Sequence, residues 1–480
     1  MQKRIGIRGL VTAVLFPSVD LLGDSITVRP GEVDPLASVV GISLFQRAVL
    51  TLQRGGIRQL IVLTGPEEEH LKQALSSGPR VSIPVRWMPI REFPLDDPRT
   101  WEFLGAEVGD CVLLLSANAI FSPHLIEHLR RESRHGKAIV VARPLSRSST
   151  MGNRGSVKSG VRLQVCGKRL TAWAPPPGDH TAPLAAAMVV LPAALLTSAS
   201  RDGGMELGRL PIRRWLELVG GDGNVRVVEA TDKQGLWYQE VTVPSDLPLA
   251  ERKLFHSLRA DAEGFVDRYF NRKLSRWFTR LFLRAGWSPN VITVVASLIG
   301  FTAAVGFSIG TYAAGVVAAL LFQLAAVIDC CDGEVARLTF AESPFGAWLD
   351  LFLDNLVHMA IFTGIAIGLY TVRMGEPGAW GWLALGGVTV LGNGLSFLLV
   401  EQARKIKAAN RWKTAAGAAW ADFMLKNVAS RDFSLMLLLF AILAKLDWFL
   451  SCAAVGSLLF AAVMAWVIRP SAVTPPNGPV

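Results

Sequence analysis

The chain has 480 residues, 51% of them hydrophobic, and a mean hydropathy of +0.36, which is too apolar for an ordinary soluble enzyme. The length allows two or three domains, and the formal charge of +10 suits anionic partners such as nucleic acid, anionic lipid or phosphate substrates. The five cysteines lack zinc-type spacing, so they exclude a disulfide framework and favour a reducing cytosolic environment.

The first half of the chain predicts an α/β domain of Rossmann type. Apolar runs typical of buried strands alternate with amphipathic stretches typical of helices, which indicates a parallel sheet covered on both faces. The predicted strands are LVTAVLF, QLIVLT, CVLLLS and AIVVA, and the helices include LFQRAVLTLQRGG and HLIEHLRRE. The first apolar run is short and is soon followed by Pro17 and Asp20, which favours a strand over a signal peptide. Residues 144–182 are rich in Ser, Gly and Pro and predict loops over weak strands.

Residues 264–286 predict an amphipathic helix between the two halves. Phe, Trp and Leu recur at helical spacing, with Arg and Lys on the opposite side. This pattern suits a helix that lies on an anionic membrane surface. A helix buried against the first domain is the alternative.

The second half predicts six transmembrane helices, since each span needs about 20 apolar residues. They are expected near 290–310, 312–333, 345–371, 379–401, 433–446 and 448–468, and the fifth is short. Residues 402–432 are rich in Lys and Arg, so the positive-inside rule places this loop in the cytosol. The first domain and the C-terminus then also lie in the cytosol. These spans favour lipid or phosphate partners, and no nucleic-acid partner is expected.

Four aspartates interrupt the most apolar part of the chain, where ionisable groups usually have a function. Asp329 and Asp332 are three residues apart, and Asp350 and Asp354 are four apart, so each pair shares one helix face. A short connection makes the two helices antiparallel neighbours, and both pairs can face one cleft. Carboxylates this close need a cation, and oxygen ligands favour Mg²⁺, Mn²⁺ or Ca²⁺. Two ions about 3.5–4 Å apart fit four carboxylates.

Three further residues suit a phosphate ligand in this cleft. Gly333 leaves room for a ligand at the backbone, Arg337 can neutralise a phosphate, and Gly346 removes a side chain at the cleft mouth. Two other interpretations of the acidic residues stay open: solvated loop ends, and a membrane carrier with an acidic ion path.

The acidic segment resembles the full signature of the CDP-alcohol phosphotransferase family. It reads Asp329-x-x-Asp332-Gly333-x-x-Ala336-Arg337, eight residues, then Gly346-x-x-x-Asp350-x-x-x-Asp354. The stretch SPNVIT, residues 288–293, is similar to the entry of that family's first helix, and Arg431-Asp432 is a weaker match. The resemblance covers residues 264–468.

This resemblance implies six membrane helices around a polar cavity that opens to the cytosol. Its implied metal ligands, for two Mg²⁺ or Mn²⁺ ions, are Asp329, Asp332, Asp350 and Asp354, with Asp354 also the general base. The residues implied at the CDP-alcohol site are Asn290, Thr293, Gly333, Arg337, Ser343 and Gly346. An acceptor hydroxyl would attack the β-phosphorus and release CMP, a reaction that depends mainly on positioning and charge neutralisation. His358, one turn after Asp354, is interpreted as a packing or supporting residue.

The first domain is similar to sugar-phosphate nucleotidyltransferases. The similar segments are residues 34–65, GDCVLLLSANAIFSP and WYQEVTVPSDLPLAERKL. The domain order resembles bifunctional inositol-1-phosphate cytidylyltransferase/di-myo-inositol-phosphate-phosphate synthases. The glycine-rich phosphate loop of such enzymes is replaced by FPSVDLLGDS, and the expected metal-binding acids by Asn118, Glu240 and Thr242. Since an amide is a poorer Mg²⁺ ligand than a carboxylate, we expect nucleotidyl transfer to be lost.

The sequence therefore predicts four regions: residues 1–255 as a cytosolic nucleotidyltransferase-like domain, 256–288 as linker and interfacial helix, 289–470 as a CDP-alcohol phosphotransferase membrane domain, and 471–480 as a disordered tail. The expected partners are a CDP-alcohol donor (CDP-diacylglycerol or a CDP-polyol), a hydroxyl acceptor and membrane lipid, and a homodimer is compatible with this organisation. The expected location is the inner (plasma) membrane, with the active site facing the cytosol. The alternative is a bifunctional enzyme whose first domain makes CDP-inositol from CTP and inositol 1-phosphate.

Overall fold

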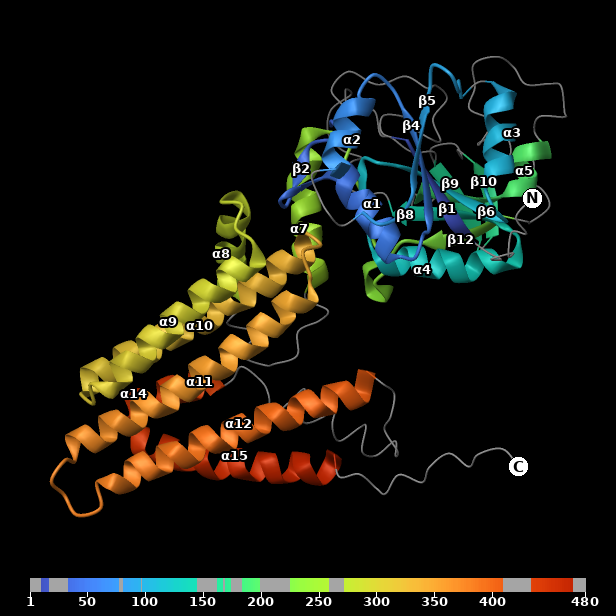
Figure 1. Cartoon of the computed structure of the whole chain (residues 1–480). Helices are drawn as coiled ribbons and strands as arrows, with labels where there is room; N and C mark the ends of the chain where they lie inside the picture. The colour runs from blue at the N-terminus through green and yellow to red at the C-terminus, as the bar shows by residue number, and fades with distance from the viewer. Residues whose placement is uncertain are drawn as a thin grey trace, which may run out of the picture. The chain divides into compact units, whose positions relative to one another are not determined.

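A computed structural model of the chain divides it into two compact units, Met1–Ser257 and Leu258–Val480 (Figure 1). The residues that the structure describes are 10–16, 33–76, 81–95, 97–144, 162–166, 169–173, 184–198, 225–258, 272–408 and 433–468. The FPSVDLLGDS segment beyond its first residue, Arg431-Asp432 and the predicted tail at 471–480 lie outside these ranges.

The first unit, called the head below, is built on a nine-stranded sheet with the order β5-β4-β1-β6-β11-β8-β12-β10-β9. The strands are β1 Leu10–Phe16, β4 Gln59–Thr64, β5 Val85–Pro89, β6 Cys111–Ser116, β8 Ala138–Pro144, β9 Arg162–Cys166, β10 Arg169–Trp173, β11 Leu184–Pro192 and β12 Val225–Glu229. Two small pairs lie outside it: β2 Ser38–Val39 with β3 Ile42–Ser43, and β7 Ala119–Phe121 with β13 Tyr238–Glu240.

Helices cover both faces of this sheet (Figure 1), because side chains alternate along each strand. On one face, Val14 and Phe16 share a core with Trp101 of α3 Pro98–Glu107 and with α5 Ala193–Ser198. On the other face, Ala13 and Leu15 pack with α1 Leu44–Arg54, α2 Glu68–Ser76 and α4 Pro123–Glu132. The last helix of the head is α7 Leu247–Ser257. The predicted α/β class and the cover on both faces are confirmed.

The sheet is mixed, so the predicted parallel arrangement holds for only part of it. Strands β5, β4, β1 and β6 are parallel, but β11 runs antiparallel to both β6 and β8. Antiparallel neighbours need no helical crossover, whereas parallel neighbours do. The strand–helix alternation that predicted a parallel sheet stops at β8, and the region predicted as loops over weak strands contributes β9 and β10 to the sheet edge.

The second unit, called the membrane unit below, consists of helices in the part that the structure describes. They are α8 Arg272–Arg284, α9 Pro289–Ser308, α10 Tyr312–Leu338, α11 Pro344–Val372, α12 Trp380–Ala408, α14 Phe433–Ile442 and α15 Leu446–Ile468. Helices α9, α10 and α11 pack together, and α12 packs along α15 (Figure 1).

Five of these helices, α9, α10, α11, α12 and α15, are long and apolar enough to cross a membrane. The predicted fifth span corresponds to α14, which has 10 described residues and falls short of a crossing by itself. Residues 409–432, directly before it, lie outside the described ranges, so the described residues support five of the six predicted spans.

Two glycines let α11 pack directly against the backbone of α9. A Cβ at Gly364 would lie 2.2 Å from the Ala304 carbonyl oxygen, and one at Gly368 would lie 2.3 Å from that of Phe307. Small residues at four-residue spacing allow such close approach between membrane helices. This contact fixes α11 beside α9, and both helices contribute residues to the candidate site.

The turn between α10 and α11 is short and tightly defined. Phe340 adopts a left-handed conformation, with φ of 55°, and the Ala341 N–H donates to the Ala336 carbonyl at 2.7 Å. This is a Schellman-type helix end, in which glycine usually takes the left-handed position. The turn reverses the chain between α10 and α11, and both helices pack against α9.

Candidate metal and active site

Three of the four predicted carboxylates meet between α10 and α11. Asp329 and Asp332 project from α10 and Asp350 from α11, and one carboxylate oxygen from each lies within 4.8 Å of the others. Asp329 and Asp332 are only 7% and 6% exposed, and Asp350 is half-buried. Like charges at this distance, shielded from water, favour binding of a cation.

The donor set fits a hard divalent cation. Every candidate ligand in the group is a carboxylate oxygen, which suits Mg²⁺ or Mn²⁺ better than zinc. The three oxygens also come from two helices whose relative position the α10–α11 turn fixes. The residues present are therefore compatible with the implied metal.

Asp332 is oriented by two hydrogen bonds. The Thr293 hydroxyl, from the first turns of α9, donates to Asp332 Oδ2, and the Gly333 N–H donates to Asp332 Oδ1. Thr293 also donates to the Pro289 carbonyl at 3.1 Å and is buried. The sequence assigned Thr293 to the CDP-alcohol site, whereas in this structure its hydroxyl orients a carboxylate of the acidic group.

Asn290, Ser343 and Gly346 come together where α9 and α11 begin. A Cβ at Gly346 would lie 3.0 Å from both Asn290 Oδ1 and Ser343 Oγ. Ser343 is the N-cap of α11, because its hydroxyl accepts a hydrogen bond from the Gly346 N–H at 3.0 Å. Two helix N-termini, which favour negative charge, therefore lie next to each other.

Arg337 lies one turn after Gly333 on the same helix. One of its terminal nitrogens would be 3.7 Å from a Cβ at Gly333. Arg337 Nε is buried and has no hydrogen-bond partner among the described residues. A buried donor of this kind suits an anionic ligand.

Asp354 follows Asp350 by one turn of α11 and is half-buried, but it does not belong to the group of three carboxylates. His358, one turn later, packs edge-on against two aromatic rings, with centroids 5.8 Å from Phe322 and 5.3 Å from Phe433. These contacts agree with the packing role expected for His358.

The sequence pattern indicates no role for Glu334, Ser275 or Thr279, which are all buried. Glu334 lies within the recognised motif, but at a position where the family signature has no fixed residue. Ser275 and Thr279 are ordinary hydroxyl residues in an amphipathic stretch. Only the packing of α8 on α10 shows that the three are in contact.

In the head, the residues at the expected metal positions form internal contacts. Asn118 is buried, its side-chain amide donates to the Val33 carbonyl at 2.8 Å, and its backbone carbonyl accepts from the Val241 N–H. A carboxylate could not donate the first of these bonds. Glu240 forms an ion pair with Arg143 at 2.6 Å, and Thr242 donates to Asp246 at 3.2 Å.

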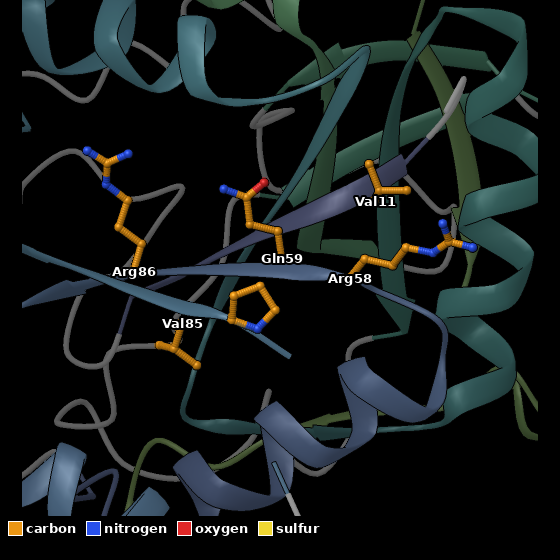
Figure 2. A pocket seen from close by; sticks show the side chains of 6 residues that line it. Val11, Arg58, Gln59, Val85 and Arg86 are labelled. Atoms are coloured by element: carbon orange, nitrogen blue, oxygen red, sulfur yellow. The ribbon is translucent and has the colours of Figure 1, made fainter. Parts of the chain in front are cut away.

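The head has a pocket at the end of the sheet opposite to Asn118 (Figure 2). Its lining comes from the first residues of β1, β4 and β5 and the residues before them: Val11, Arg58, Gln59, Pro84, Val85 and Arg86. Asn118 follows the carboxyl end of β6, which is parallel to β1. The pocket therefore differs from the predicted nucleotide region, and Arg86 already pairs with Glu107 at 2.7 Å.

Comparison with known proteins agrees with this organisation. A curated relative, the "Bifunctional IPC transferase and DIPP synthase" of Rubrobacter xylanophilus, is 29% identical over 445 residues, which is 91% of each chain. The "Archaetidylinositol phosphate synthase" of Pyrococcus horikoshii is 34% identical over 83 residues, covering 17% of this chain and 43% of the relative.

Among solved structures, the inositol-1-phosphate CTP transferase from T. maritima is 11% identical, with a TM-score of 0.40 over 53% of this chain and 99% of its own. The sequence model of the CDP-alcohol phosphatidyltransferase family matches residues 287–474, which contain the entire acidic group. The acidic group therefore lies in the part of the chain that is similar to the CDP-alcohol phosphatidyltransferase family.

Proposed function

We propose that the membrane unit transfers a phosphoalcohol from a CDP-alcohol to an acceptor hydroxyl and releases CMP. The observation that carries this proposal is the group formed by Asp329, Asp332 and Asp350, which lies within the segment that matches the family. The relatives named above are a transferase–synthase and a synthase, so they favour an enzyme over a membrane carrier with an acidic ion path.

Asp329, Asp332 and Asp350 would hold Mg²⁺ or Mn²⁺, and Asp354 would complete a set of four for two ions. When bound, the metal would neutralise negative charge on the phosphates. Thr293 supports this assignment, because its hydrogen bond fixes the orientation of the Asp332 carboxylate.

The CDP-alcohol would bind where α9 and α11 begin. Asn290, Ser343 and Gly346 lie together there, and two helix N-termini favour its phosphates. Gly333 leaves the backbone accessible, and Arg337, whose Nε is buried without a partner among the described residues, would donate to a phosphate oxygen.

In the transfer step, the acceptor hydroxyl oxygen bonds to the β-phosphorus of the donor. The bond from this phosphorus to the bridging oxygen breaks, and CMP leaves with that oxygen. Asp354 takes the hydroxyl proton, because it lies one turn beyond the acidic group and its carboxylate can act as a general base.

We further propose six membrane crossings, with α14 as part of the fifth, and a site that faces the cytosol of a cell inner membrane. The apolar length of the other five helices supports the location. The exposed face of α8, with Trp277 61% exposed, suits contact with membrane lipid. A homodimer is compatible with this arrangement.

For the head, we propose a non-catalytic role. Asn118, Glu240 and Thr242 are committed to contacts within the domain, and an amide replaces a carboxylate at one expected metal position. The second candidate function is cytidylyl transfer from CTP to inositol 1-phosphate. It is favoured by the similarity to a bifunctional relative over 91% of this chain.

The test is mass spectrometry of lipids and polyols from cells that express the full chain or its Asp354→Asn variant. We expect a phosphodiester product with the wild type and none with the variant. Its identity would distinguish a CDP-diacylglycerol donor from a CDP-polyol donor. Identical lipid and polyol profiles for the wild type, the variant and an empty vector would contradict the proposal.

A further inference from the structure

A buried carboxylate joins the metal-bearing helix to α8. Glu334 of α10 is 3% exposed and accepts two hydrogen bonds, from Ser275 Oγ at 3.0 Å and from Thr279 Oγ1 at 2.7 Å. Each hydroxyl reaches a different carboxylate oxygen. Both hydroxyl residues are fully buried and lie four apart, on one face of α8.

This contact lies immediately next to the metal site along α10. Cys331 Sγ, one residue before Asp332, donates to the Ser275 carbonyl at 3.4 Å. Phe282 of α8 packs in one apolar cluster with Ile328 and Val335. The segment that carries Asp329 and Asp332 is therefore held to α8 by both polar and apolar contacts.

The direction of Glu334 matters more than its distance from the aspartates. Successive residues of an α-helix are rotated by about 100°, so Glu334 lies roughly 200° from Asp332 and roughly 140° from Asp329. Glu334 therefore projects from the side of α10 opposite to the acidic pair. A contact on this side can fix the rotation of α10 about its own axis.

We infer that Glu334, Ser275 and Thr279 form a positioning clamp, which turns Asp329 and Asp332 of α10 toward Asp350 of α11. This inference rests on the proposed function, because it concerns the same metal site. The three residues touch neither substrate nor metal and act only through the orientation of α10.

The choice of residues supports positioning over simple adhesion between helices. Apolar contacts such as those of Phe282 are non-directional and tolerate small rotations. A carboxylate that accepts two hydroxyl hydrogen bonds accepts only a narrow range of helix orientations, because hydrogen bonds weaken steeply with angle. Burial makes loss of either bond costly, so the geometry is retained.

The experiment measures Mn²⁺ binding to the purified full-length protein in detergent, from the electron paramagnetic resonance signal of free Mn²⁺. The main variant is Ser275→Ala/Thr279→Val, which removes both donors but no charge. Glu334→Ala removes the acceptor, and Glu334→Gln removes only the charge, since an amide can still pair with two hydroxyls. The control is Thr302→Val on α9, whose exposed hydroxyl bonds to the Leu298 carbonyl of its own helix.

We expect the double variant and Glu334→Ala to weaken Mn²⁺ binding about tenfold, the lower end for residues that support metal ligands. Glu334→Gln and Thr302→Val should stay close to the wild type. Thr279→Val alone keeps the Ser275 bond and should show a smaller loss, which also provides a test if the double variant does not fold. The melting temperature of each variant in detergent, compared with that of the wild type, shows whether the variant is folded.

Wild-type affinity in the double variant, or in Thr279→Val if only that variant folds, would overturn the clamp. A loss in Glu334→Gln as large as in Glu334→Ala would also overturn it, since charge would then be the cause. If the wild type bound no Mn²⁺, the metal assignment and the clamp would fail together. If the clamp variants behaved as expected but no CDP-alcohol gave CMP, only the proposed function would fail.

Discussion

At the scale of single residues, the acidic cleft separates its carboxylates by position. Asp329, Asp332 and Asp350 face one another, whereas Asp354 lies one helical turn further along α11. A carboxylate fully committed to metal binding is a poor proton acceptor. The separation therefore suits Asp354, at the edge of the proposed metal set, for the additional role of general base.

The two roles predict different responses to removal of a charge. Asp354→Asn cannot accept a proton at neutral pH, so CMP release should fall roughly 10²- to 10⁴-fold while donor binding is retained. Asp332→Asn should weaken metal binding instead, and added Mg²⁺ should partly restore its activity. Steady-state CMP release against Mg²⁺ concentration distinguishes the two. Equal rescue of both variants by Mg²⁺ would make Asp354 a ligand only, and His358 would become the next candidate base.

Arg337 should act on the donor rather than on the metal. Arg337→Ala removes a half-buried guanidinium beside Gly333, so affinity for the CDP-alcohol should fall about tenfold or more. The apparent Mg²⁺ affinity should stay near the wild-type value. Binding of a CDP-alcohol, measured by isothermal titration calorimetry, checks the first point. An unchanged affinity would remove Arg337 from the donor site.

Asn118 should be structural in the head. Asn118→Asp replaces a donor to the Val33 carbonyl with an acceptor, so it should destabilise the head by about 1–3 kcal/mol. Neither Asn118→Asp nor Asn118→Ala should change CMP release from a supplied CDP-alcohol. The head would be a working cytidylyltransferase if the wild type made CDP-polyol from CTP and a phosphorylated polyol, and Asn118→Ala abolished that product.

Much of the acidic cleft could be predicted at this scale because helical spacing is regular. Residues three and four apart share a face, so the two acidic pairs were expected to meet, and Asp329, Asp332 and Asp350 do. The exact partner of a hydroxyl is not periodic, so spacing alone does not predict that Thr293, expected at the CDP-alcohol site, donates to Asp332. The Glu334 contact depends on how α8 packs, and spacing along the sequence carries no such information.

At the scale of elements, the site depends on how closely α9, α10 and α11 approach. Gly364 and Gly368 let α11 contact the α9 backbone, and the tight α10–α11 turn fixes the third helix. Phe340 takes the left-handed position of this turn at a cost of roughly 1–2 kcal/mol, which the surrounding contacts must offset.

Gly364→Ala should separate α9 from α11, since its new Cβ would lie 2.2 Å from a backbone oxygen that cannot rotate away. Overpacking of this kind usually costs about 1–3 kcal/mol, and metal binding should weaken because Thr293 and Asp350 move apart. Gly387→Ala on α12 is the matched control, because a Cβ there meets nothing within 4 Å. Thermal unfolding in detergent gives the melting temperature of each variant. Equal melting temperatures would contradict this account of the helix contact.

Apolar runs predicted the elements well where one run makes one element. LVTAVLF, QLIVLT and CVLLLS coincide with β1, β4 and β6. Strand direction could not be predicted in the same way, because β11 is antiparallel through long-range pairing that leaves no local pattern. The fifth span is short in the sequence, and its described helix has only 10 residues.

At the scale of the whole molecule, the two units differ in how they use the residues expected at functional sites. In the membrane unit, three of the expected carboxylates meet, and Asn290, Ser343 and Gly346 lie together where α9 and α11 begin. In the head, the corresponding residues are used for internal contacts. The chain thus resembles its bifunctional relative along its length, while the features that suit catalysis are concentrated in the membrane unit.

The most direct test of the central claim is CMP release by the purified full-length protein, supplied with Mg²⁺ or Mn²⁺, a hydroxyl acceptor, and CDP-diacylglycerol or CDP-inositol in turn. We predict release with one of these donors, complete loss in excess chelator, and recovery when the metal is restored. Asp350→Asn should release CMP at least about tenfold more slowly at the same metal concentration. Undiminished release in excess chelator, or wild-type release by Asp350→Asn, would contradict a metal-dependent transfer in this cleft.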